Sequence, residues 1–310
     1  MRKDAGVDGD AQRLGQLTWL LFLKIFDDRE QEWELTVNRY RSPIPEELRW
    51  RNWATDIEGL TGDGLLEFIN NKLFPTLKGL SADASPRHRV IHDVFEDAYQ
   101  YMKNGTLLRQ VINRLNESLD FNRLEDRHVF GDLYEQILKD IQSAGNAGEY
   151  YTPRAVTQFM VDMVNPQLGE KVLDPACGTG GFLTCLGGRG SRRAVFGRRS
   201  TIAARQEPRP PKQVKTPDGE ELLQRSVLGI EKKPLPHLLC VTNMLLHGID
   251  VPTNIATTTR SRNRWPATSP RIASMRSSPI RLSVAWKRTA SKPIVHRSSA
   301  RARRRICFWF

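Results

Sequence analysis

The sequence KVLDPACGTGGF occupies residues 171–182. Its first four residues form a short apolar run that ends in Asp174, which predicts a buried strand. Gly178 and Gly180 follow in a turn, where the absence of side chains lets the backbone approach a ligand at the carboxyl end of the strand. Phe182 begins a helical pattern. A strand, a glycine-rich turn and a helix in this order indicate the opening of a doubly wound α/β sheet.

The same alternation extends on both sides of this stretch. Residues 153–164 predict a helix, residues 226–231 predict a second strand, and residues 236–246 predict a further helix. We therefore assign residues 125–255 to an incomplete α/β domain. A basic insertion at 186–213 interrupts it, with eight basic residues against one acidic residue.

Residues 1–124 carry helical periodicity and no recognisable chemistry. Apolar residues at helical spacing over 11–33 predict a helix with one broad buried face. Further helices are predicted at 64–74, 88–102, 107–119 and 128–143. The fold class is thus α/β, with an all-helical N-terminal domain in front of the sheet.

The net charge of +12 is concentrated near the end of the chain. Residues 251–310 hold fourteen of the 47 Lys and Arg residues and none of the 35 Asp and Glu residues, so the first 250 residues are slightly acidic. We predict a disordered basic tail over 256–310, because no apolar period persists there. One alternative is a non-catalytic DNA-binding or assembly protein whose tail neutralises phosphates.

Cysteines and hydropathy exclude several classes of protein. The four cysteines form no Cys-x-x-Cys pair, which argues against a zinc site and a disulfide framework and predicts no metal. No apolar run approaches the roughly 20 residues that cross a bilayer, and we expect no cleavable leader. We expect a cytoplasmic protein with no membrane contact.

Glu231 ends the second predicted strand, where a Rossmann-like site places an acid on ribose hydroxyls. The alternative is a solvated side chain beside Lys232 and Lys233. A nicotinamide-dependent oxidoreductase would also use such an acid. Its Gly-x-Gly-x-x-Gly turn is missing here, so that function is disfavoured.

The phrase DPACGTGGF resembles the S-adenosylmethionine loop of amino-group DNA methyltransferases. Upstream, GEYYTPR at 148–154 resembles the segment that lines the methionine end of the cofactor in DNA-adenine methyltransferases, although Thr152 before Pro153 also suits a helix N-cap. The modification (methyltransferase) subunits of type I restriction-modification systems are the family that the chain resembles over residues 4–185 and 213–255. Its supporting phrases are LTWLLFLKIFDD at 17–28, KKPLPHLLC at 232–240 and NMLLHGI at 243–249.

This resemblance implies methyl transfer from S-adenosyl-L-methionine to adenine N6 in double-stranded DNA, with the base flipped out of the duplex. It also implies partnership with specificity and restriction subunits, the helical domain serving assembly and DNA engagement. The cofactor-binding residues that it implies are Tyr150, Tyr151, Thr152, Asp174, Ala176, Gly178, Gly180 and Glu231.

One motif of the family is missing. Its enzymes carry Asn-Pro-Pro-Phe or Asp-Pro-Pro-Tyr after the fourth strand, to hold the adenine amine and stack on the base. No such tetrapeptide occurs here, and Asn165-Pro166 cannot replace it because it precedes the glycine loop. We therefore predict no catalytic residue in this chain, poor cofactor binding and no methyl transfer.

The genetic code allows the missing motif to be encoded near the end of the chain in another reading frame. Residues 279–292 can be encoded by codons that spell Asn-Pro-Pro-Phe-Gly-Gly-Met-Glu-Glu-Asp-Gly-Ile-Glu in a shifted frame. Residues 302–310 can likewise be regrouped into an acidic and then apolar phrase. We predict that the sequence after Ile255 is translated in the wrong frame, and a genuine basic tail is the alternative.

Overall fold

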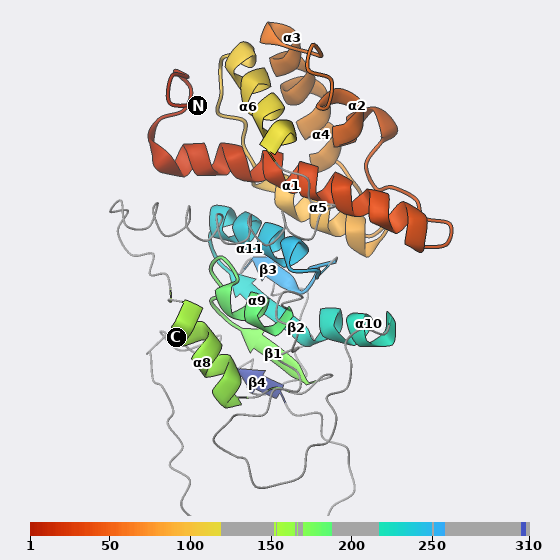
Figure 1. Cartoon of the computed structure of the whole chain (residues 1–310), viewed down its shortest axis with the longest axis vertical. Helices are drawn as coiled ribbons and strands as arrows, with labels where there is room; N and C mark the ends of the chain where they lie inside the picture. The colour runs from red at the N-terminus through yellow and green to blue at the C-terminus, as the bar shows by residue number, and fades with distance from the viewer. Residues whose placement is uncertain are drawn as a thin grey trace, which may run out of the picture.

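A computed structural model describes residues 1–118, 152, 154–164, 166, 170–187, 217–249, 251–257 and 305–307. The described part has a helical N-terminal layer stacked on a parallel sheet and its helices (Figure 1). This arrangement confirms the predicted fold class, an all-helical domain followed by an incomplete Rossmann-like α/β domain.

The helical layer is built from short elements around one long helix. They are α1 (Gly9–Thr36), the 3-10 turn η1 (Glu46–Leu48), α2 (Trp50–Trp53), α3 (Gly62–Glu67), the π-helical segment η2 (Phe68–Leu73), α4 (Phe74–Lys78), α5 (Pro86–Glu96) and α6 (Gly105–Ser118). The helix predicted at 128–143 lies outside the described residues.

The helix predicted over 64–74 lies within a longer helical stretch, at 62–78, that changes its hydrogen-bond pattern in the middle. It divides into α3, η2 and α4, and the Phe74 N–H donates to the Ile69 carbonyl, five residues back. Pro75 follows directly and has no N–H to continue the usual ladder. A wider π turn ahead of the proline accommodates the break.

The helix α1 is buried more completely than its pattern predicts. We expected one broad buried face, but every residue from Thr18 to Glu30 is buried. The cause is its place between two layers, since α1 contacts α2 above and α11 (Pro234–Leu246) below (Figure 1). A sequence period cannot reveal a second partner that comes from a distant segment.

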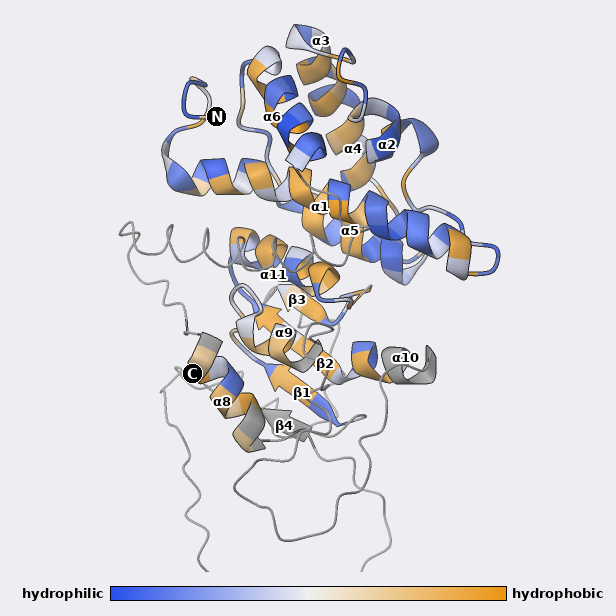
Figure 2. Ribbon diagram, in the orientation of Figure 1, coloured by the Kyte–Doolittle hydropathy of each residue, from blue (hydrophilic) through white to orange (hydrophobic). Residues whose placement is uncertain are grey.

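Charged residues in the second half of α1 are buried and contact half-buried partners from other segments. This half is mainly hydrophilic in Figure 2, yet Asp27 and Glu30 are almost fully buried. Arg51 Nε lies 2.9 Å from Asp27 Oδ1, and its Nη2 lies 3.7 Å from Glu30 Oε2. Tyr40 donates its hydroxyl to Glu30 at 2.7 Å. Such pairing lets acidic side chains remain inside a core.

The helix predicted at 88–102 ends early, at Glu96. Beyond it, buried Asp4 accepts the Lys103 and Asn104 N–H groups at 3.0 Å each, and Gln16 accepts that of Tyr101 at 2.9 Å. These side chains replace the helical partners of the backbone. Because they come from the N-terminal region, the local pattern could not predict them.

Among the described residues, the sheet has four strands in the order β3-β2-β1-β4, all paired in parallel. The strands are β1 (Lys171–Asp174), β2 (Val227–Glu231), β3 (Ile255–Thr257) and β4 (Arg305–Cys307). The predicted bounds of β1 are confirmed, and β2 begins one residue later than predicted. Neither β3 nor β4 was predicted, and both include residues from the segment expected to be a disordered tail. The rest of that segment, 258–304 and 308–310, lies outside the described residues.

In the described part of this layer, the helices are α8 (Arg154–Val164), α9 (Gly181–Gly187), α10 (Pro217–Ser226) and α11. Residues 237–245 of α11 are all buried, because α11 contacts both the sheet and α1. One hydrophobic core therefore runs from the helical layer into the sheet. Within the described residues, no helix has both the length and the apolar character needed to span a membrane.

Candidate functional site

Two carboxylates lie at the ends of neighbouring parallel strands. Asp174 is the last residue of β1 and Glu231 is the last residue of β2, and Asp174 is in register with Gly229. The carboxyl ends of parallel strands meet at one edge, and the strand order reverses at β1, with β2 on one side and β4 on the other. Such a reversal is where open α/β sheets bind ligands.

The two glycines of the intervening loop serve different purposes. Both have positive φ, +53° at Gly178 and +83° at Gly180, a conformation that other residues adopt only under strain. A Cβ atom on Gly178 would meet nothing within 4 Å, whereas one on Gly180 would lie 2.8 Å from Cys240 Sγ. We expected the backbone at both glycines to be open to a ligand, and the structure shows this space at Gly178. At Gly180 the missing side chain makes room for α11.

Glu231 forms hydrogen bonds that hold the glycine loop in place. Its Oε2 accepts the Gly178 N–H at 2.9 Å, and its Oε1 accepts the N–H groups of Lys232 at 2.7 Å and Lys233 at 2.9 Å. The side chain is half-buried, and its Oε1 lies on the exposed side beside Lys232 and Lys233. A carboxylate has about four acceptor positions, and these contacts use three of them.

Asp174 is a buried carboxyl in an unfavourable environment for charge. It is 1% exposed, and burial raises its pKa to about 6. The Ala176 N–H, which donates to Oδ1 at 3.1 Å, opposes this rise in pKa, and the negative charge of Glu231 adds to it. No salt bridge to Asp174 is formed within the described residues. A cationic ligand at this place would stabilise the ionised form.

The cysteines near the loop are packing residues. Cys177 and Cys240 are buried free thiols whose sulfurs lie 3.8 Å apart. The contact with Cys240 and the burial raise the pKa of the Cys177 thiol, which keeps it protonated and unreactive. Cys185 is also a buried, reduced thiol, and its sulfur donates to the Gly181 carbonyl at 3.3 Å. For these three residues, the prediction of reduced, packed thiols is confirmed.

The helix α11 supplies contacts to the loop that the sequence did not reveal. Cys240 and Met244 pack against the place where a Cβ of Gly180 would be, and Asn243 donates from Nδ2 to the Thr179 carbonyl at 3.0 Å. These three positions are spaced i, i+3 and i+4, so they share one helical face. That spacing was a signal for a common partner, but it did not identify the loop.

The remaining residues of the expected site are only partly described. Thr152 is half-buried, close in sequence to α8, and α8 packs against α9. Ala176 is exposed beside the loop. Tyr150 and Tyr151 lie outside the described residues.

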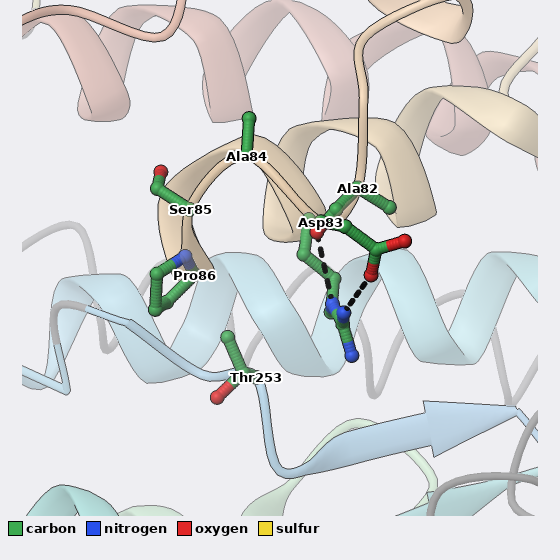
Figure 3. A pocket seen from close by; sticks show the side chains of 7 residues that line it. Ala82, Asp83, Ala84, Ser85, Pro86 and Thr253 are labelled. Atoms are coloured by element: carbon green, nitrogen blue, oxygen red, sulfur yellow. Dashed lines mark hydrogen bonds and ion pairs between the residues drawn. The ribbon is translucent and has the colours of Figure 1, made fainter.

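A hollow of about 280 Å³ lies elsewhere, between the loop that precedes α5 and the turn that precedes β3 (Figure 3). Arg89 is the cation in its lining, and its guanidinium already contacts the Asp83 carboxylate at 2.6 Å and the Ala82 carbonyl at 3.1 Å. The hollow offers a concave surface, whereas the groups suited to ligand chemistry lie at the glycine loop. We choose the glycine loop, because an ionisable buried group, positive-φ glycines and a second carboxylate meet there.

Two sequence families match this chain. Residues 1–115 match the HsdM N-terminal domain, and residues 125–270 match N-6 DNA Methylase. The second match extends past residue 255, where we expected the frame to change.

Known relatives agree with these matches. The methylase subunit of the type I restriction enzyme EcoEI from Escherichia coli is 59% identical over 257 residues, which are 82% of this chain and 48% of that protein. A modification subunit assigned to a type I restriction enzyme from Vibrio vulnificus YJ016 is 41% identical with a TM-score of 0.64, covering 80% of this chain and 51% of that one. A structure from a study of complex assembly and conformational transition of the type I R-M system is 33% identical, with a TM-score of 0.63 over 82% and 47%. The chain spans about half the length of these relatives.

Proposed function

Because this chain belongs to the N-6 DNA Methylase family and begins with the HsdM N-terminal domain, we propose that it is the cofactor-binding half of a type I modification subunit. Its site would hold S-adenosyl-L-methionine at the carboxyl edge of β1 and β2. The observation that carries this proposal is Asp174, a buried carboxyl without a cationic partner in the described structure, beside the open backbone of Gly178.

The residues present fit this cofactor. S-adenosyl-L-methionine, when bound, supplies an electrophilic methyl group on a sulfonium, and its sulfonium and ammonium outweigh its single carboxylate. Ionised Asp174 would stabilise that net positive charge in a low-dielectric environment. The space in front of Gly178 admits a ligand against the backbone.

Other residues would complete the contacts. Glu231 has about one acceptor position left, enough for one ribose hydroxyl while it continues to brace the loop. Ala176 and Gly180 would line the same edge, Gly180 on the side that packs against α11. By the family resemblance, Tyr150, Tyr151 and Thr152 would lie at the methionine end.

The complete reaction needs more than this chain contains. Adenine N6 methylation requires a group that accepts hydrogen bonds from the amine and an aromatic ring that stacks on the flipped base. The Asn-Pro-Pro-Phe motif that supplies both is absent from the sequence. We propose that the chain binds cofactor weakly and transfers no methyl group. Double-stranded DNA and the specificity and restriction subunits are its proposed partners.

Calorimetric titration with S-adenosyl-L-methionine tests the cofactor site. We expect weak binding by the chain and at least tenfold weaker binding by Asp174→Ala, which removes a charge-assisted contact. Asp83→Ala is the matched control, because it removes an exposed carboxylate that lines the hollow. This variant should bind S-adenosyl-L-methionine with the affinity of the unmodified chain. If the unmodified chain and Asp174→Ala bind S-adenosyl-L-methionine equally well, the glycine loop is only a packing turn.

A second function rests on the charge of the tail. Fourteen basic residues and no acidic residue over 251–310 would favour non-catalytic DNA binding through phosphates. Replacing the basic residues between β3 and β4 by glutamine separates the two proposals without removing a strand of the sheet. If the tail binds DNA, these substitutions abolish salt-dependent DNA binding and leave cofactor binding intact.

A further inference from the structure

One peptide group of the glycine loop is held from both ends. Between Thr179 and Gly180, the Gly180 N–H donates to the Cys177 carbonyl at 2.8 Å. The Thr179 carbonyl accepts the side-chain amide of Asn243 at 3.0 Å. These two bonds fix the orientation of the peptide plane. Because the plane lies between two positive-φ glycines, they also fix the conformation that leaves Gly178 open.

Asn243 is an unusual residue for its position. It is 2% exposed in the middle of α11, between Thr242 and Met244 in a wholly buried stretch. A carbonyl can only accept a hydrogen bond, so the Asn243 nitrogen must face Thr179. Its Oδ1 is then left without a hydrogen-bond partner in the described part of the chain.

Packing alone does not account for this amide. Leaving a buried carbonyl oxygen unpaired costs free energy comparable to what one hydrogen bond contributes, so the two effects nearly cancel. A leucine of similar size would fill the same space without the unpaired oxygen. The contribution of Asn243 must therefore lie in what its amide does to the loop.

We propose that Asn243 is a positioning residue of the cofactor site, whose amide holds the Thr179–Gly180 peptide so that the backbone of Gly178 faces the ligand. This role rests on the proposed function, since it acts on the same site. Asn243 touches no reacting atom and acts through the loop. None of the cofactor-site residues inferred from the sequence has this role.

The test compares two asparagines with the same local contact. Asn254 also donates from Nδ2 to a backbone carbonyl at 3.0 Å, that of Gln224, away from the glycine loop. Asn243→Leu and Asn254→Leu each remove one such bond. We expect Asn243→Leu to weaken S-adenosyl-L-methionine binding by calorimetry about tenfold, while Asn254→Leu leaves it unchanged. Urea denaturation should show that Asn243→Leu loses no more stability than Asn254→Leu.

A second readout does not depend on cofactor. Hydrogen exchange of the Gly180 amide in the free chain should be about tenfold faster in Asn243→Leu and unchanged in Asn254→Leu. Asn243→Ala, which cannot clash with α11 or the loop, should behave as Asn243→Leu does and replaces it if the leucine prevents folding.

The outcomes are distinguishable. If the unmodified chain binds no cofactor, the proposed function fails, and the exchange of Gly180 still decides whether Asn243 holds the loop. If exchange and affinity change equally in the Asn243 and Asn254 variants, or in neither, the positioning role is overturned.

Discussion

Two buried carboxyl groups, one in each layer of the molecule, differ in their surroundings. In the helical layer, burial raises the pKa of Glu30, while hydrogen bonds from Ser42 and Tyr40 and the nearby Arg49 act against that rise. In the α/β layer, burial raises the pKa of Asp174 to about 6, and among the described residues the Ala176 N–H opposes this rise while Glu231 adds to it.

The difference assigns Glu30 a structural role and makes Asp174 a candidate for ligand binding. Glu30 has cations within the fold, at 3.7 Å from Arg51 and 3.9 Å from Arg49, and they offset part of the cost of burying its charge. Asp174 is buried and has an anion as its charged neighbour, so its ionised form destabilises the fold until a cation binds. Buried groups in this second situation are candidates for ligand binding. The following variants test the comparison, beginning with the largest effect.

Removing a cation from the helical layer should have the largest effect. Arg51→Ala leaves Asp27 and Glu30 buried with fewer partners, and we expect the free energy of unfolding in urea to fall by about 4 kcal/mol. Arg114→Ala breaks an exposed pair with Glu117 and should cost well under 1 kcal/mol. A loss below 1 kcal/mol for Arg51→Ala would mean that Glu30 does not depend on its cations.

Neutralising Asp174 should stabilise the protein. Raising a carboxyl pKa from 3.8 to about 6 costs the ionised fold about 3 kcal/mol, so Asp174→Asn should gain about that much at pH 7. The folded state holds the proton more tightly than the unfolded state. The advantage of the variant should therefore shrink as pH falls through 6 and vanish below about 4. An advantage that is independent of pH would contradict the raised pKa.

The two loop glycines should differ by a smaller amount. Gly180→Ala combines positive-φ strain with a Cβ placed 2.8 Å from Cys240 Sγ, and should cost about 2 kcal/mol. Gly178→Ala carries the strain alone and should cost about 1 kcal/mol. Thermal unfolding measures both variants, and equal losses would show that contact with α11 does not constrain the loop.

Local patterns predicted the site better than they predicted the layers around it. The bounds of β1 and the convergence of Asp174 and Glu231 follow from strand patterns and the parallel rule. Burial of α1 on all sides, the early end of α5 and the role of Asn243 depend on contacts between distant segments. The strand β4 pairs residues about 130 positions apart, which no local period indicates.

The nucleotide sequence of the gene decides the origin of the tail. If the frame changes after Ile255, the codons for residues 279–292 spell Asn-Pro-Pro-Phe in the shifted frame, and restoring that frame should help to restore methyl transfer. Correction of the insertion at 186–213 belongs to the same repair. Codons that do not spell the motif would leave a genuine basic tail as the explanation.

Calorimetry at pH 6 in two buffers of different ionisation enthalpy tests most directly whether Asp174 receives its cation from the cofactor. Near its pKa of about 6, roughly half of the Asp174 carboxyls are protonated, so binding of S-adenosyl-L-methionine should release roughly half a proton per cofactor. Asp174→Asn should release none. Measurable binding without proton release, or the same release from Asp174→Asn, would contradict the account.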